Sequence, residues 1–136
     1  MTPEQIALVE DTVVTVDIKA VAADFYRRAF AREPGLEAMF ATDRSVQEAR
    51  FAAELATIVT SIRDHDAFLG VARALGVRHR RYGVRPVHYR LMGDVLFEAL
   101  AAALGDGWTS RVEEAWRTAY SLTAETMMLA AAEPAR

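Results

Sequence analysis

Signals that begin and end helices recur along the whole chain, and they limit the possible folds more than any other feature of this sequence. Runs of strict apolar and polar alternation, which half-buried strands require, are almost absent. Instead, Ser, Thr and Asp residues precede apolar stripes at helical spacing, and Gly or Pro residues follow those stripes. The sequence therefore predicts helices throughout, which is an all-α fold.

The expected helices are unequal in length. They cover approximately residues 3–15, 17–32, 45–63, 66–81, 86–104 and 110 towards the C-terminus, with a short turn over 34–40. Three capping boxes mark helix starts, namely Thr2 with Gln5, Ser45 with Glu48, and Ser110 with Glu113. Gly83 and Pro86 separate the fourth and fifth helices. Unequal helices with a mid-chain break are typical of an irregular α-fold rather than of a four-helix bundle.

Composition narrows the class of protein. A chain of 136 residues with 52% hydrophobic residues can bury one core, so we expect a single domain over residues 1–136. We expect a cytoplasmic protein without membrane contact, because no apolar run is long enough for a span and no leader is evident. The net charge of −3 argues against general nucleic-acid binding. Because the chain has no Cys, a tightly held metal must rest on His or carboxylate ligands.

One histidine lies where an apolar residue is expected. Phe68, Ala72, Leu75 and His79 are spaced by four, three and four residues, so they share one face of the predicted fourth helix. His79 should therefore be buried or nearly so. It is either a core histidine with satisfied hydrogen bonds or a ligand to a buried iron.

Two further polar side chains are expected to point inward. Gln47 begins an apolar stripe that continues through Phe51, Leu55, Ile58 and Ile62. Its amide is either partly exposed at the helix end or buried with a partner. Tyr26 lies within an aromatic cluster, where a tyrosine usually packs with its hydroxyl satisfied. Together with His79, these residues form the minimum set for a five-coordinate haem: one imidazole and two donors on the open side.

At this point the sequence resembles a known family, the bacterial single-domain haemoglobins and the globin domain of flavohaemoglobins. The segment DFYRRAFAREPGLEAMF, residues 24–40, is similar to the second helix of that family and the turn that follows it. The run from Gln47 to His79 aligns without a gap, and Tyr89 follows His79 at the family's spacing. The resemblance covers nearly the whole chain.

The resemblance implies a globin fold with six to seven helices around a haem pocket and a short or disordered D region. It implies haem b as the cofactor and His79 as the proximal ligand of the iron. On the distal side, which faces the gas ligand, it places Tyr26 and Gln47 and makes Phe40 the phenylalanine that stacks on the haem. It also places Tyr89 and Glu133 beside the proximal imidazole, where they would raise its basicity.

The sequence departs from the family pattern near the distal side. Phe51 replaces the leucine usual in the family next to the ligand site, which should shrink the pocket. The connection from Phe40 to Gln47 is shorter than in flavohaemoglobins, so Arg44 is an alternative to Gln47 as the residue that contacts the ligand. Glu133 is close to the C-terminus, where helices commonly fray.

The functions that the resemblance implies are binding of O2, NO and CO and conversion of NO to nitrate. A separate flavoprotein reductase would supply electrons, because the chain has no βαβ unit with a glycine-rich turn for a dinucleotide. The alternatives are an oxygen carrier or store without turnover and a ligand-responsive sensor or regulatory globin. The resemblance leaves a homodimer open, since bacterial relatives are often dimers.

An arginine cluster stands out from the acidic balance of the chain. Its members lie between residues 78 and 90: Arg78, Arg80, Arg81, Arg85 and Arg90. The cluster is either a solvated helix end or a surface that attracts haem propionates or docks an acidic reductase. His65 and His88 are expected to be exposed, and neither is assigned a role.

Overall fold

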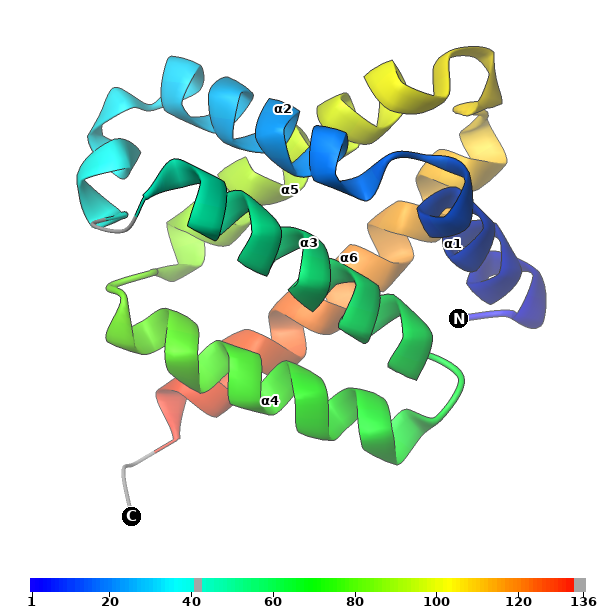
Figure 1. The fold of residues 1–136 in the computed structure, drawn as a ribbon. Helices are drawn as coiled ribbons and strands as arrows, with labels where there is room; N and C mark the ends of the chain where they lie inside the picture. The colour runs from blue at the N-terminus through cyan, green and yellow to red at the C-terminus, as the bar shows by residue number, and fades with distance from the viewer. Residues whose placement is uncertain (41–42, 134–136) are drawn as a thin grey trace.

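The computed structural model describes residues 1–40 and 43–133, and this part of the chain is helical without any strand. Its elements are α1 (Pro3–Thr15), α2 (Ile18–Arg32), the 3₁₀ helix η1 (Pro34–Met39), α3 (Arg44–Ser61), α4 (His65–Arg81), α5 (Pro86–Leu104), the 3₁₀ helix η2 (Gly105–Gly107) and α6 (Ser110–Ala132) (Figure 1). The predicted all-α class is confirmed. The described residues between η1 and α3 add no further helix, as expected for a short D region, and residues 41–42 of that region lie outside the described part.

Local signals explain several helix ends. The capping box of α1 is confirmed, because the Thr2 hydroxyl accepts a hydrogen bond from the Gln5 amide at 3.1 Å and the Gln5 side chain accepts one from the Thr2 amide at 3.0 Å. Gly83 follows α4 with φ of +84°, a conformation that glycine adopts without strain. Pro86 opens α5, where its missing N–H costs nothing.

Two of the three predicted capping boxes are wrong. Asp43 rather than Ser45 caps α3, since its carboxylate accepts a hydrogen bond from the Ser45 amide at 2.8 Å. Thr109 rather than Ser110 caps α6, and its hydroxyl accepts from the Val112 amide at 3.3 Å. In both places a good capping residue stands one or two residues before the predicted one, and the earlier residue takes the role.

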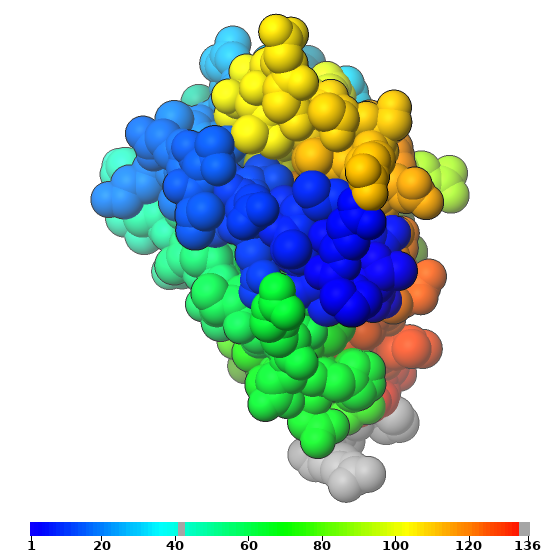
Figure 2. All heavy atoms as spheres, turned by 90° about the vertical axis from the view of Figure 1, so that its right-hand side faces the viewer, coloured from blue at the N-terminus to red at the C-terminus, as the bar shows by residue number. Residues whose placement is uncertain are grey.

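The helices cross in an irregular stack rather than a parallel bundle. In Figure 1, α3 runs across the front between α2 above and α4 below, while α5 and α6 pass behind. α4 packs most extensively against α6, and α2 packs against both α3 and α5. Figure 2 shows α1, in dark blue, covering one end of the molecule between the α5–α6 connection and the α3–α4 turn. No helix in the described part is long and apolar enough to span a membrane.

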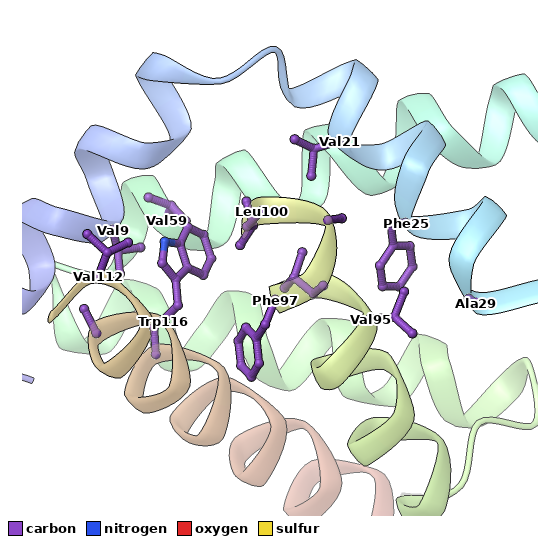
Figure 3. Close-up of a cluster of buried hydrophobic side chains, with 14 of the residues drawn as sticks. Val9, Val21, Phe25, Ala29, Val59, Val95, Phe97, Leu100, Val112 and Trp116 are labelled. Atoms are coloured by element: carbon purple, nitrogen blue, oxygen red, sulfur yellow. The ribbon is translucent and has the colours of Figure 1, made fainter. Parts of the chain in front are cut away.

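The buried side chains form two hydrophobic clusters. The larger one joins α1, α2, α5 and α6, and Figure 3 shows Trp116 beside Val9 and Val112 within it. The smaller one is centred on α4 and includes Phe68, Leu75 and their neighbours on α3, α5 and α6. The stripe that predicted a buried face of the fourth helix is therefore confirmed for Phe68, Ala72 and Leu75.

A glycine allows α4 and α6 to approach closely. A Cβ atom on Gly76 would lie 2.3 Å from the backbone oxygen of Met127, which is far inside van der Waals contact. Any larger residue at this crossing would push the two helices apart. This crossing fixes how the end of α4, and with it His79, lies relative to α6.

Candidate functional site

A cavity of about 190 Å³ separates the two hydrophobic clusters. Side chains from α2 through α6 line it, and most of them are aliphatic or aromatic. Tyr82, which is exposed, also lines the cavity, so the cavity reaches the surface where α4 ends. The site is thus an apolar pocket with one open edge, which is the usual form of a small-molecule or cofactor site.

His79 faces this cavity from the last turn of α4. Its Nδ1 lies 2.9 Å from the Leu75 carbonyl oxygen, and because a carbonyl only accepts, Nδ1 carries the proton. Nε2 makes no hydrogen bond with the described residues, and no buried side-chain nitrogen or oxygen among them lacks a partner. Nε2 is therefore open to the cavity. Burial lowers the pKa of His79, and the nearby Arg78 charge lowers it further, while the Leu75 hydrogen bond raises it in part. The net lowering of the pKa favours the neutral imidazole.

Tyr89 lies beside His79, and Glu133 does not. The Tyr89 ring stacks near the imidazole with 6.3 Å between ring centroids, and it lines the cavity. Glu133 is exposed beyond the end of α6, and only its backbone oxygen contacts α4, accepting from the Arg80 guanidinium at 3.3 Å. The expected series from His79 through Tyr89 to Glu133 is therefore not formed, because Glu133 lies exposed beyond the end of α6 and does not line the cavity.

A tyrosine that the sequence analysis did not single out for the site supports this wall. The hydroxyl of Tyr120 donates a hydrogen bond to the backbone carbonyl of Tyr89, and its ring lines the cavity. Burial raises the pKa of Tyr120 well above its usual range, so it stays a donor. A Cβ on Gly93 would come within 2.6 Å of the Tyr120 ring, so this glycine makes room for it. Tyr120 follows the buried Trp116 by four residues, a spacing that indicates the inner face of α6, but only the structure gives its partner.

Tyr26 and Gln47 lie on the walls formed by α2 and α3. Both line the cavity, and neither side chain makes a hydrogen bond within the described part of the chain. Tyr26 is only 5% exposed, so its unpaired hydroxyl must face the cavity rather than the bulk solvent. Burial raises the pKa of Tyr26 to about 12, which keeps the hydroxyl protonated at neutral pH.

Aromatic rings surround the Tyr26 side chain. Phe40 meets its ring edge-on at 5.4 Å between centroids, and Phe51 does so at 5.8 Å. Phe51 also stacks on Phe25 at 4.3 Å. Phe40 and Phe51 both line the cavity, where the sequence analysis expected them.

Arg44, the alternative to Gln47, points elsewhere. Its guanidinium lies over the Phe30 ring at 4.8 Å from the centroid, and Arg44 is not among the residues lining the cavity. Gln47 is therefore the α3 amide that faces the cavity. The sequence analysis left this choice open because the length of the preceding connection does not fix the orientation of the first turn of α3.

Charged residues at the rim were missed by the sequence analysis. Arg50 and Glu54 line the cavity, and Arg78 approaches Glu54 at 3.7 Å. Burial raises the pKa of Glu54, and Arg78 and Arg50 lower it in part. Both α3 residues follow Gln47 at helical spacings of three and seven, which is the signal that would have found them.

The donor set shows which kind of metal centre the cavity fits. A free metal ion needs three or four protein ligands, and no group of three or more His, Cys, Asp or Glu side chains that could hold one exists among residues 1–40 and 43–133. A single open imidazole in an apolar pocket suits a metal whose other ligands come from a flat organic macrocycle. Haem is such a group, so the residues present fit it.

Comparisons with known proteins agree with this geometry. The family model described as Globin matches residues 23–127. A flavohemoprotein of Deinococcus radiodurans is 31% identical over 133 residues, which is 94% of this chain and 33% of that protein. A flavohemoprotein of Halalkalibacterium halodurans is 31% identical over 114 residues, covering 81% of this chain and 28% of that protein. The chain thus spans about a third of the length of the curated relatives that it matches.

Solved structures give the same fold. One is an engineered carbene transferase made from a Rhodothermus marinus protein described as a nitric oxide dioxygenase, with 27% identity, a TM-score of 0.87 and coverage of 97% of this chain and 94% of that one. A hexacoordinated haem protein from an anhydrobiotic tardigrade, at 16% identity, shares the fold with a TM-score of 0.85 and coverage of 98% and 96%. This chain therefore belongs to the globin family, and the relatives that it matches are globin domains of flavohemoproteins.

Proposed function

We propose that this protein would hold haem in the cavity through Nε2 of His79, and that Tyr26 and Gln47 would face the bound gas, O2 or NO. The observation that carries the proposal is the unpaired Nε2 of His79, which opens into an apolar cavity whose other walls hold two unpaired polar groups. Polar groups that face a cavity without a partner among the described residues are available to a bound group, and haem with its gas ligand would pair with all three. The family and the haem proteins among the structural neighbours support this.

Haem would supply an iron centre that binds diatomic gases and changes its oxidation state. The chain prepares His79 for this group in two ways. Burial favours the neutral imidazole, which is the form that can ligate a metal. The hydrogen bond from Nδ1 to the Leu75 carbonyl fixes the ring orientation and leaves the lone pair on Nε2.

Tyr26 and Gln47 would bind the gas ligand. The Tyr26 hydroxyl remains protonated at neutral pH and the Gln47 amide has N–H groups, so both can donate hydrogen bonds to an oxygen atom with partial negative charge. Phe40 and Phe51 exclude water from the space around Tyr26, which strengthens such bonds. The expected consequence is slow release of O2.

The activity that we propose is nitric oxide dioxygenation. In the net reaction, NO and O2 take up one electron and give nitrate. We assign the supply of that electron to a flavoprotein reductase, because the curated relatives are flavohemoproteins and the 136 residues contain no glycine-rich dinucleotide turn. In those relatives the matched region is about a third of a protein named for both flavin and haem, which supports an electron path from a flavin to this type of globin.

Oxygen carriage without turnover is a second candidate, and one observation favours it. The proximal imidazole donates to a neutral backbone carbonyl rather than to a carboxylate, because Glu133 lies outside the cavity. A carbonyl partner raises the basicity of the imidazole less than a carboxylate does. Weaker electron donation suits reversible binding more than reactive chemistry.

Haem titration with absorption spectra tests the proposed ligand. Wild-type protein should bind one haem and show a Soret shift when CO is added to the ferrous form, and His79→Gly should lose this spectrum and regain it with added imidazole. His65→Ala is the matched control, since His65 is exposed at the other end of α4. An unchanged spectrum in His79→Gly would contradict the ligand assignment.

Nitrate formation separates the two candidates. Ferrous haem-loaded protein is mixed with NO in air-saturated buffer, and nitrate is measured against the haem-free protein. Fast, stoichiometric nitrate supports dioxygenation. Nitrate at the control rate, together with reversible O2 binding, assigns the protein to carriage.

A further inference from the structure

We propose that the α4–α5 corner, residues 77–90, docks an acidic electron-donor protein beside the open edge of the cavity. This inference rests on the proposed function, because it gives the electron for the haem a place of entry. It concerns the arginine cluster between residues 78 and 90, none of whose arginines lines the cavity.

The corner lies in a stretch of the sequence that contains basic residues and no acidic ones. Residues 67–93 contain six arginines and no Asp or Glu, although the chain as a whole has a net charge of −3. The remainder of the protein is therefore strongly acidic. A protein with such a charge asymmetry orients an acidic partner towards its basic side during approach.

The arginines of the corner are largely unpaired. Arg81, Arg85 and Arg90 are exposed and form no ion pair within the described part of the chain. Arg78 contacts Glu54 at 3.7 Å, and Arg80 donates only to a backbone oxygen. Arginines outside the corner commonly have carboxylate partners, as do Arg27, Arg28, Arg32, Arg63, Arg111 and Arg117. Unpaired guanidinium groups remain available for carboxylates of a second protein.

Exposed apolar side chains are interleaved with these arginines. Val77, Tyr82 and Val87 are 39%, 52% and 65% exposed. Arginine, tyrosine and aliphatic contacts are typical of protein interfaces. An extended polyanion such as nucleic acid would also meet the acidic remainder of the surface, whereas a compact acidic patch can touch the corner alone. The corner therefore fits a protein better than a nucleic acid.

The corner adjoins the site that needs the electron. Tyr82 and Val84 belong to the corner and also line the cavity, and His79 lies in the last turn of α4. A donor bound here would contact Tyr82, which is exposed and also lines the cavity. In the transfer, the donor's reduced flavin loses one electron and releases a proton to solvent, and ferric haem gains the electron and becomes ferrous.

Reduction kinetics test the docking surface. The probe is reduced flavodoxin, a small acidic flavoprotein, mixed with ferric haem-loaded protein at several ionic strengths. The corner variant is Arg80→Gln/Arg81→Gln/Arg85→Gln. The control variant, Lys19→Gln/Arg27→Gln/Arg111→Gln, changes the net charge equally on other exposed parts of the surface. Reduced riboflavin, which is small and has no protein surface to dock, reports access to the haem without docking.

The expected result is specific to the corner. At low ionic strength the rate constant with flavodoxin should fall about tenfold or more in the corner variant and little in the control, because steering of this kind changes association rates by about 10 to 10³. The dependence on salt should flatten in the corner variant only. Reduction by riboflavin should be the same in all three proteins.

Several results would overturn the proposal. Equal flavodoxin rates in wild type and corner variant, no reduction by flavodoxin at all, or equal losses in the two variants would remove docking at this corner while the proposed function stands. A loss of riboflavin reduction in the corner variant would show a damaged haem site instead. Cosedimentation with phosphatidylglycerol vesicles that depends on the corner arginines would assign it to a membrane surface. Failure of the wild type to load haem would remove the proposed function and this inference together.

Discussion

The two sides of the cavity are held in different ways. The side that carries His79 is fixed by main-chain contacts, since Gly76 lies against the Met127 backbone and the Leu75 carbonyl holds the imidazole. The side that carries Tyr26 and Gln47 is held by stacked and edge-on aromatic rings, and its polar groups are unpaired within the described residues.

One side of the cavity positions the metal-binding nitrogen, and the other side offers hydrogen bonds to a small ligand. Main-chain contacts leave little freedom, so the metal-binding nitrogen on the His79 side is placed by the crossing of two helices. On the Tyr26 side, hydrogen-bond donors stay available because none of the described residues pairs with them, and a small ligand can do so. Substitutions on the first side should act mainly on stability, and those on the second mainly on ligand affinity.

The largest effect is expected from Gly76→Ala. The added Cβ would lie 2.3 Å from the Met127 backbone oxygen, so α4 and α6 must separate. Overpacking of this kind costs about 3 kcal/mol of unfolding free energy, and here it should also weaken haem binding. Urea unfolding and haem titration of the variant measure both effects.

Gly70→Ala is the matched control in the same helix. Nothing lies within 4 Å of a Cβ at Gly70, and alanine is the better helix former, so this variant should gain about 0.5–1 kcal/mol. Equal losses in both variants would show that helix α4 as a whole, rather than its crossing with α6, limits stability.

Tyr26→Phe should act on the ligand and hardly on the fold. Removing the hydroxyl deletes a donor that has no partner among residues 1–40 and 43–133, so O2 dissociation should speed up by roughly tenfold to a hundredfold, the value of one charge-assisted hydrogen bond. Stopped-flow release of O2 measures this. Tyr89→Phe, on the His79 side, should leave the rate nearly unchanged. A similar acceleration in both variants would contradict the division between the two sides.

The sequence predicted most of this fold because its signals are local. The capping box at Thr2, the left-handed Gly83 and the opening Pro86 each need only neighbouring residues, and all three are confirmed. The Ser110 box failed because Thr109 caps α6 instead. The Glu113 carboxylate accepts from the Trp108 indole at 3.2 Å, a partner that the box pattern does not include.

The candidate site was predictable where helical spacing was enough. The stripes that end at His79 and begin at Gln47 place both side chains on inner faces, and the structure puts both on the cavity. Glu133 was misplaced because its position depends on where α6 crosses α4, which the contact of Gly76 with Met127 sets. Such a crossing joins residues far apart in sequence, and no local pattern reveals it.

Tyr120→Phe should have a smaller effect, on the His79 side. The variant loses the hydrogen bond from the Tyr120 hydroxyl to the Tyr89 carbonyl, which should cost about 1 kcal/mol of unfolding free energy. The haem spectrum should shift slightly, because the Tyr89 ring lies beside the imidazole. Tyr82→Phe is the control, since its ring also lies near the imidazole but its hydroxyl makes no hydrogen bond with the described residues, and it should change neither measurement. A spectral change without a loss of stability would show that Tyr120 acts on the haem directly.

The smallest effect is expected from Glu54→Gln at the rim between the two sides. Burial raises the folded-state pKa of Glu54 above its ordinary value of 4.5, more than Arg78 and Arg50 lower it. In the pH window above 4.5 the folded protein therefore holds more protons than the unfolded chain, and its stability falls as pH rises through the raised pKa. The variant lacks this carboxyl, so its stability relative to wild type should rise across that window and stay constant above it.

Glu10→Gln should show the opposite sign, because Arg63 lowers the pKa of Glu10 and wild type loses that contribution as pH falls. Urea unfolding of the three haem-free proteins on both sides of pH 4.5 measures the difference. A Glu54→Gln curve parallel to that of wild type would mean that the Arg78 contact cancels the cost of burying Glu54.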